Sequence, residues 1–178
     1  MAAQPLKLTY QYLTKLKWGY ILLFMDEQLV QSIRAQCQIV DVSCADANLR
    51  RATRAVTRLY DQVLAPSGLL ATQFTLLVAC AVAGPAPIST LADALAMDRT
   101  TLARNLKLVE RRGLVKVIPG EDRRERIVTL NDIGYSTLSK ALPLWQEAQT
   151  QIIESFGQNR LNHLLQDLSA MVVLTHES

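Results

Sequence analysis

A short turn in the second half of the chain concentrates charged side chains at one point. The turn, PGEDRRER at residues 119–126, is flanked by two apolar, strand-like runs, Leu114–Ile118 and Ile127–Leu130. Pro119 and Gly120 are of the types that begin tight turns, so the stretch predicts a β-hairpin with arginines at its tip. Arginines in this position can enter the minor groove of DNA, where the negative potential is concentrated.

Acidic residues in the same turn would orient its arginines. Asp122 is the expected pairing partner, and Arg124, beside Arg123, is the side chain that we expect to enter the groove. The alternative is a solvated turn whose charges neutralise one another. The helices predicted directly upstream favour the groove-binding interpretation.

Directly before the hairpin, the sequence predicts two helices joined by a tight turn. The first, STLADALAM, is short and is expected to be capped by Ser89. The second, DRTTLARNLKLVERRG, has Asp98 as its expected N-cap and Gly113 as its C-terminal stop. A short helix, a tight turn and a longer basic helix are typical of a helix-turn-helix motif.

The second of these helices separates apolar from polar side chains by angle. Leu102, Leu106 and Val109 fall on one face and are expected to pack in the core. Hydroxyl, amide and cationic groups occupy the opposite face and its edges: Thr100, Thr101, Arg104, Asn105, Lys107 and Arg111. Such groups suit base edges and phosphates in a major groove, although an ordinary solvated helix face has a similar composition.

The positive charge of the chain is local. The 178 residues carry a net charge of +3, and residues 98–126 contain nine Lys or Arg against five Asp or Glu, a local charge of +4. Because Lys and Arg displace the counterions condensed on DNA, this distribution indicates a phosphate-contacting surface. With 49% hydrophobic and 20% charged residues, the chain is expected to form a packed core.

The composition also argues against other classes of protein. Three cysteines (Cys37, Cys44 and Cys80) without a CxxC pair, and two histidines, predict neither a zinc site nor a disulfide framework; Cys80 is expected in the core. The longest apolar run, Tyr20–Met25, is too short to span a membrane. No catalytic triad, glycine-rich phosphate loop or carboxylate pair is found. We therefore expect a cytoplasmic protein that is not an enzyme and needs no cofactor.

Further helices are expected on both sides of the motif. One extends from Asp46 to the breaker at residues 66–68, and the next begins with Thr72 as its expected N-cap. Two long amphipathic helices follow the hairpin, and Pro143 starts or kinks one of them. For residues 1–45, extra helices and a poorly ordered extension both stay open.

The run LADALAMDRTTLARNLKLVERRGLVKVIPGEDRRERIVTLNDIG resembles the MarR family of winged helix-turn-helix transcription regulators. The resemblance rests on DRTTLARNLKLVERRGLV, on the wing DRRERIVTL, and on Gly134, which opens the next helix. With the flanking helices it extends over about residues 46–175. Residues 1–45 have no counterpart in the shorter family pattern.

The resemblance implies a mostly α fold with a small β-hairpin wing. A MarR-like domain at residues 46–178 would contain a winged helix-turn-helix lobe, residues 69–134. Residues 46–66 and 135–175 would form a helical dimerisation layer. The expected protein is a homodimer that binds a pseudo-palindromic operator in double-stranded DNA, most often as a repressor.

The family pattern also implies which residues contact DNA. Thr100, Thr101 and Arg104 would read the major groove, and Asp122 with Arg124 would form the wing pair. The full set of expected DNA-binding residues is Ser89, Arg99, Thr100, Thr101, Arg104, Asn105, Lys107, Asp122, Arg123 and Arg124.

Two kinds of signal are compatible with the resemblance. A small-molecule inducer would bind between the dimerisation helices and the DNA-binding lobe. Peroxide-sensing relatives instead use a cysteine near the start of the first matched helix. Here Asp46 occupies that position and Arg50 replaces an expected tyrosine, whereas Tyr60 is present. Cys44 lies two residues earlier, where Arg50 and Arg51 would favour its thiolate; a plain structural thiol is the competing interpretation.

A further alternative belongs to a different functional class. A winged-helix protein can serve as an interaction module whose basic face binds an acidic protein. Competition by unrelated DNA distinguishes the two, because an operator-binding protein prefers its own site by several kcal/mol.

Overall fold

The computed structural model describes residues 26–122 and 125–176. Its helices are α2 (Glu27–Ser43), α3 (Ala45–Leu64), α4 (Ala71–Ala83), α5 (Ile88–Ala94), α6 (Arg99–Arg111), α7 (Asp132–Phe156) and α8 (Gln158–His176), with a 3-10 turn, η1, at Ala65–Ser67. Its strands are β1 (Ala86–Pro87), β2 (Val115–Pro119) and β3 (Arg126–Leu130). The expected mostly helical fold with a small sheet is confirmed.

By its contacts the chain divides into two units, Met1–Thr53 and Arg54–Ser178, and the boundary falls within α3. In the first unit, the side chain of Asp26 caps α2 by accepting a hydrogen bond from the amide of Gln28 (2.9 Å). An exposed ion pair between Arg51 and Asp41 (3.1 Å) joins α3 to α2.

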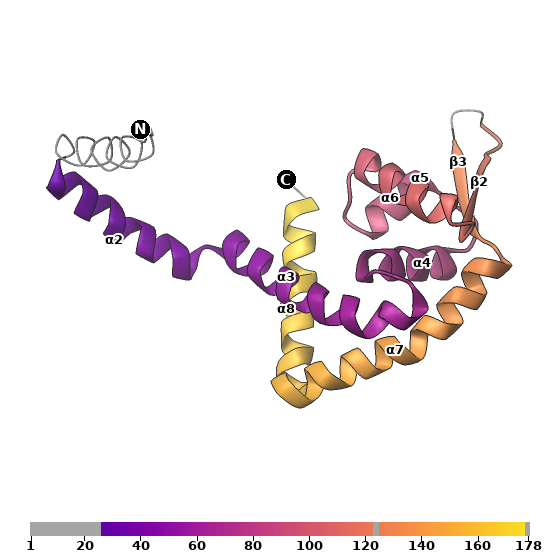
Figure 1. The fold of residues 1–178 in the computed structure, drawn as a ribbon. Helices are drawn as coiled ribbons and strands as arrows, with labels where there is room; N and C mark the ends of the chain where they lie inside the picture. The colour runs from indigo at the N-terminus through magenta and orange to yellow at the C-terminus, as the bar shows by residue number, and fades with distance from the viewer. Residues whose placement is uncertain (1–25, 123–124, 177–178) are drawn as a thin grey trace, which may run out of the picture. The chain divides into compact units, whose positions relative to one another are not determined.

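Helix α4 is central to the core of the second unit. Phe74, Leu76, Leu77 and Cys80 on this helix are all buried. The helix packs against α5 and α6 and also against α7 and β3 (Figure 1). Since nearly all of α4 is apolar, its sequence suits a helix that is covered on several sides.

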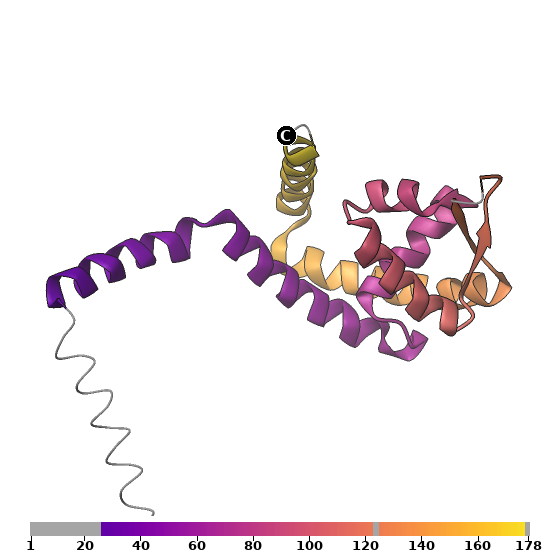
Figure 2. The same ribbon diagram turned by 90° about the horizontal axis from the view of Figure 1, so that it is seen from above.

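The wing is part of a three-stranded antiparallel sheet in the order β1-β3-β2; the hairpin of β2 and β3 is labelled in Figure 1 and is seen from above in Figure 2. Strands β2 and β3 form the expected hairpin, with Val115 opposite Leu130 and Pro119 opposite Arg126. Strand β1 adds Ala86 opposite Val128. Two residues, one of them proline, are too few to show strand periodicity, so no sequence pattern indicates β1.

Two expected helix caps were wrong. Helix α4 has Leu70 rather than Thr72 as its N-cap, and the amide of Ala71 donates to Asp61 Oδ1 (2.7 Å). The carboxylate of Asp61 in α3 thus accepts a hydrogen bond at the start of α4, where the hydroxyl of Thr72 was expected to cap the helix. Ser89 lies in the first turn of α5 instead of preceding that helix.

The helices that follow the wing agree with the sequence pattern. Pro143 lies inside α7 and does not start it. Gly157 caps the C-terminal end of α7, and its φ of 90° favours glycine. Among the described residues, no single helix is long and apolar enough to span a membrane. The bent pair Ala45–Ser67 and Ala71–Ala83 has the length and composition of a span only when its two parts are taken together.

Candidate nucleic-acid interface

The start of α6 is fixed by the predicted cap. Asp98 Oδ1 accepts a hydrogen bond from the backbone amide of Thr101 (2.8 Å). The side-chain hydrogen bond with Thr101, followed by that residue's backbone amide, holds the pKa of the Asp98 carboxyl below its ordinary value, and Arg104 adds a smaller Coulombic contribution. The carboxylate therefore favours this helix start in its charged form.

The predicted faces of α6 are present. Leu102, Leu106 and Val109 are 0%, 2% and 0% exposed. Arg99, Thr100, Arg104, Lys107 and Arg111 are exposed, and so are Leu108 and Glu110. The helix thus presents cationic and hydroxyl groups outward while its opposite face anchors it to the core, which is the orientation that major-groove contacts need.

Three other expected contact residues are less accessible. Ser89, Thr101 and Asn105 are half-buried. Thr101 is engaged in the cap of α6, and Asn105 lines a cavity beneath that helix. The angular pattern placed Asn105 on the flank of the helix but could not show which neighbouring element it faces.

A basic residue next to the polar face has a structural role. Arg112 donates to Gln73 Oε1 (2.7 Å) and to the carbonyl oxygen of Gly68 (2.9 Å). These bonds join the end of α6 to the segment that begins α4. The sequence pattern indicates Arg112 only as part of the basic region, because its partners lie 39 and 44 residues away along the chain.

Asn131 joins the end of α6 to the start of α7. Its amide nitrogen donates to the carbonyl oxygen of Gly113 (2.8 Å), and its Oδ1 accepts from the amide of Gly134 (2.9 Å). A Cβ atom on Gly134 would lie 2.0 Å from the carbonyl oxygen of Leu114. Only glycine therefore permits this approach of α7 to the wing.

Two backbone hydrogen bonds between described residues close the hairpin tip. The amide of Gly120 donates to the carbonyl oxygen of Glu125 (3.0 Å), and the amide of Glu125 donates to the carbonyl oxygen of Asp122 (2.9 Å). Along the strands, Lys116 and Arg126 are exposed. Arg123 and Arg124 lie outside the described residues, so the wing pair stays a prediction.

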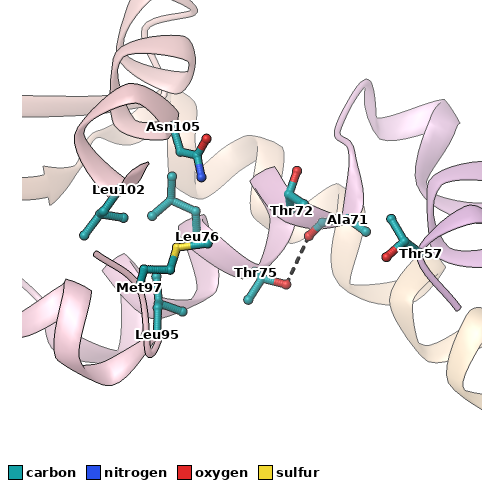
Figure 3. Close-up of a pocket in the computed structure, with 9 residues that line it drawn as sticks. All are labelled: Thr57, Ala71, Thr72, Thr75, Leu76, Leu95, Met97, Leu102 and Asn105. Carbon is teal, nitrogen blue, oxygen red and sulfur yellow. Dashed lines mark hydrogen bonds between the residues drawn. The ribbon is translucent and has the colours of Figure 1, made fainter. Parts of the chain in front are cut away.

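A cavity of about 170 Å³ lies among α3, α4, the turn before α6, and α6 itself (Figure 3). Its lining consists of Thr57, Ala71, Thr72, Thr75, Leu76, Leu95, Met97, Leu102 and Asn105. The lining is uncharged. Because Asn105 belongs to α6, an occupant of this cavity would contact that helix directly.

A neighbouring cavity of about 250 Å³ shares Thr57, Ala71 and Thr75 with the first. Its remaining lining residues are Val56, Tyr60, Phe74 and Trp145. The rings of Phe74 and Trp145 stack with their centroids 6.4 Å apart, and the hydroxyl of Tyr60 donates to Gln149. Burial raises the pKa of Tyr60, so its hydroxyl stays a hydrogen-bond donor at neutral pH.

The three cysteines lie in different environments. Cys37 is exposed, Cys44 is half-buried, and Cys80 is buried, which raises the pKa of its thiol to about 11. The arginines expected to act on Cys44 both pair with carboxylates: Arg50 with Asp46 and Arg51 with Asp41. Within the described residues, no group of three or more His, Cys, Asp or Glu side chains could hold a metal ion.

Comparisons with known proteins agree with this architecture. The model of the MarR family matches residues 67–125. One similar structure is the crystal structure of the Mycobacterium tuberculosis transcriptional regulator MosR in complex with DNA. The MosR sequence is 35% identical to this one, the match covers 76% of this chain and 98% of MosR, and the TM-score is 0.70. No curated protein matches the sequence.

Two further solved structures show the same fold. The transcriptional repressor CouR, bound to a 23-mer DNA duplex, is 25% identical over 74% of this chain and 94% of its own, with a TM-score of 0.67. A MarR variant from Escherichia coli, complexed with operator DNA, is 20% identical over 74% of this chain and 96% of its own, also with a TM-score of 0.67. The chain belongs to the MarR family of winged-helix transcription regulators.

Proposed function

We propose that this protein is a sequence-specific, DNA-binding transcription regulator that acts in the cytoplasm and catalyses no reaction. The observation that carries the proposal is the exposed polar face of α6, anchored by the buried Leu102, Leu106 and Val109. MosR, which shares 35% identity over nearly its whole length, was crystallised with DNA.

Two elements bind DNA, and each contacts a different groove. Helix α6 enters the major groove, where Thr100 and Arg104 contact base edges and Lys107 contacts phosphate. The wing reaches the adjacent minor groove through Arg124, with Asp122 as its partner. Because Arg112, Asn131 and Gly134 tie the wing, α6 and α7 together, the two elements bind as one rigid lobe.

The operator is pseudo-palindromic because the protein binds as a homodimer. Helices α3, α7 and α8 form the dimer layer. Apolar side chains on α8 support this assignment, since Leu164 and Leu165 are 40% and 48% exposed in the single chain. Large exposed apolar groups on one helix indicate a protein interface.

Regulation by a small molecule is the finer part of the proposal. The adjoining cavities offer apolar and aromatic walls, threonine hydroxyls and the amide of Asn105, without a charged group in their lining. They suit a small uncharged molecule, preferably aromatic, with one or two hydrogen-bonding groups. An occupant that moves Asn105 would displace α6, release DNA and relieve repression. Nothing in the surroundings of Cys44 favours the redox alternative, which stays a prediction.

Fluorescence anisotropy tests the proposed function. Labelled DNA from upstream of the protein's own gene is titrated with protein and compared with a scrambled duplex of equal length. We expect tight, site-preferring binding with two protomers per duplex. Equal and weak binding to both duplexes, together with preferential binding to an acidic protein, would favour the interaction-module alternative.

A further inference from the structure

Helix α2 carries an apolar stripe that no described residue of its own unit covers. None of its 17 residues is buried. Leu29, Ile33 and Val40 are 54%, 48% and 58% exposed, and Cys37 is also exposed. Spacings of four, four and three residues place these four side chains on one face of the helix.

The rest of the α2 surface is predominantly polar. Opposite the stripe and at its edges lie Glu27, Gln28, Gln31, Arg34, Gln38 and Asp41, while Ile39 and Val42 lie outside the stripe. A helix in a folded protein is stabilised mainly by burying its apolar face. The stripe therefore indicates an interface.

The coverage of the MosR comparison agrees with a position of α2 outside the family pattern. MosR matches over 98% of its own length but only 76% of this chain. The unmatched quarter is about as long as residues 1–45, the extension that precedes the family pattern. The stripe is therefore an addition to the dimerisation layer proposed above, and its occupant is a separate question.

The charges beside the stripe identify that occupant. Arg34 and Asp41 lie seven residues apart and hence on the same edge of the stripe. When two identical helices pack antiparallel about a twofold axis, these edges face each other. Arg34 then lies opposite Asp41 of the partner subunit, and the symmetry repeats the pair. Asp41 already accepts from Arg51 of its own chain (3.1 Å), so the carboxylate would bridge two arginines.

We propose that α2 is a second dimerisation element that pairs antiparallel with α2 of another copy of this chain. In the register that aligns the stripes, Ile33 lies against Val40 of the partner subunit, and Leu29 lies against the partner's Cys44. Cys37 then lies beside the partner's Cys37, next to the twofold axis. A helix rises about 1.5 Å per residue, so the two Cys44 residues are roughly 20 Å apart.

Cross-linking of the full-length protein with a short bismaleimide tests both the pairing and its direction. The Cys44→Ser variant keeps Cys37 and should give at least fivefold more two-chain product than Cys37→Ser, which keeps Cys44. Adding Leu29→Cys to Cys37→Ser should restore the product, which also shows that Cys44 is reactive. Cys80 is buried and does not contribute.

Two matched charge substitutions test the stripe itself. In the Cys44→Ser background, Ile33→Glu should lower the cross-linked yield at least fivefold, whereas Gln38→Glu on the polar face should leave it unchanged. Absence of product from Cys37, equal yields from Cys37 and Cys44, or equal effects of the two glutamates would overturn the proposal. Operator binding, measured on the same variants, keeps a failure here separate from a failure of the proposed function.

Discussion

The amide nitrogen of Asn131 donates a hydrogen bond to the carbonyl oxygen of Gly113 across 2.8 Å. Eighteen residues and the whole wing separate the two along the chain. The same side chain caps α7 through the amide of Gly134. One residue thus fixes the end of α6, the base of the wing and the start of α7 relative to one another.

Substitution of Asn131 should therefore affect both stability and DNA binding. Asn131→Ala removes the α7 cap and leaves the carbonyl of Gly113 without its donor, which should lower the free energy of unfolding by about 1–3 kcal/mol. Urea denaturation measures this change. Asn159→Ala in α8 is the control and should have little effect on the free energy of unfolding. If both variants lower this free energy equally, the role of Asn131 is contradicted.

Gly134 should not accept even a methyl group. Gly134→Ala would place Cβ against the backbone oxygen of Leu114, which cannot rotate away, and should cost about 3 kcal/mol of stability. Gly120→Ala is the matched comparison and should cost less, because its Cβ would meet side-chain atoms of Glu125 at 2.8–3.2 Å rather than a backbone oxygen at 2.0 Å. Thermal unfolding should separate the two variants clearly. A Gly134→Ala protein as stable as wild type would refute the close approach.

The cap of α6 should make stability depend on pH. Because the pKa of Asp98 is lowered by folding, its stabilisation is present above the unfolded pKa, about 3.9, and is lost as the pH falls through the folded value. Asp98→Asn keeps a capping oxygen without a titrating group. Between pH 6 and pH 3, the melting temperature of wild type should therefore fall further than that of Asp98→Asn. Parallel curves for wild type and Asp98→Asn would contradict this assignment.

The thiol of Cys80 should be chemically inert in the folded protein. Burial raises its pKa to about 11, so hardly any thiolate is present at neutral pH. In labelling with a thiol reagent, Cys80 should react only as the core opens in urea. Fast labelling of Cys80 in buffer, identified by peptide mass spectrometry, would contradict its burial.

A larger side chain in the wall that the two cavities share should occupy the place of a ligand or prevent the ligand from binding. Thr75→Phe adds a ring to a residue that lines both cavities. We expect this variant to lose the rise in melting temperature that small uncharged aromatic compounds give to wild type. Thr137→Phe on α7, away from both cavities, serves as the control. A compound that stabilises wild type and Thr75→Phe equally would bind elsewhere.

Local patterns predicted much of the lobe because they encode local structure. The periodicity of Leu102, Leu106 and Val109 gave the buried face of α6, and Asp98 and Gly113 gave its ends. The apolar runs on either side of the charged turn gave β2 and β3 to within a residue.

Contacts between distant segments were not predictable in this way. Asp61 caps α4 from ten residues upstream, and Arg112 reaches back to Gly68. Nothing in the local sequence distinguishes these charged residues from solvated ones, since their roles depend on tertiary packing. The same is true of Asn105, which faces a cavity that several elements enclose.

The most direct test of the central claim compares Arg104→Ala with Lys140→Ala in anisotropy titrations over a range of salt concentrations. Both variants remove one exposed positive charge, but only Arg104 lies on the polar face of α6. Arg104→Ala should weaken operator binding by about 1–3 kcal/mol, roughly five- to 150-fold, and should reduce the ratio of operator affinity to scrambled-DNA affinity, whereas Lys140→Ala should bind as wild type does. If Arg104→Ala binds the operator as tightly and as selectively as wild type at every salt concentration, α6 does not read DNA.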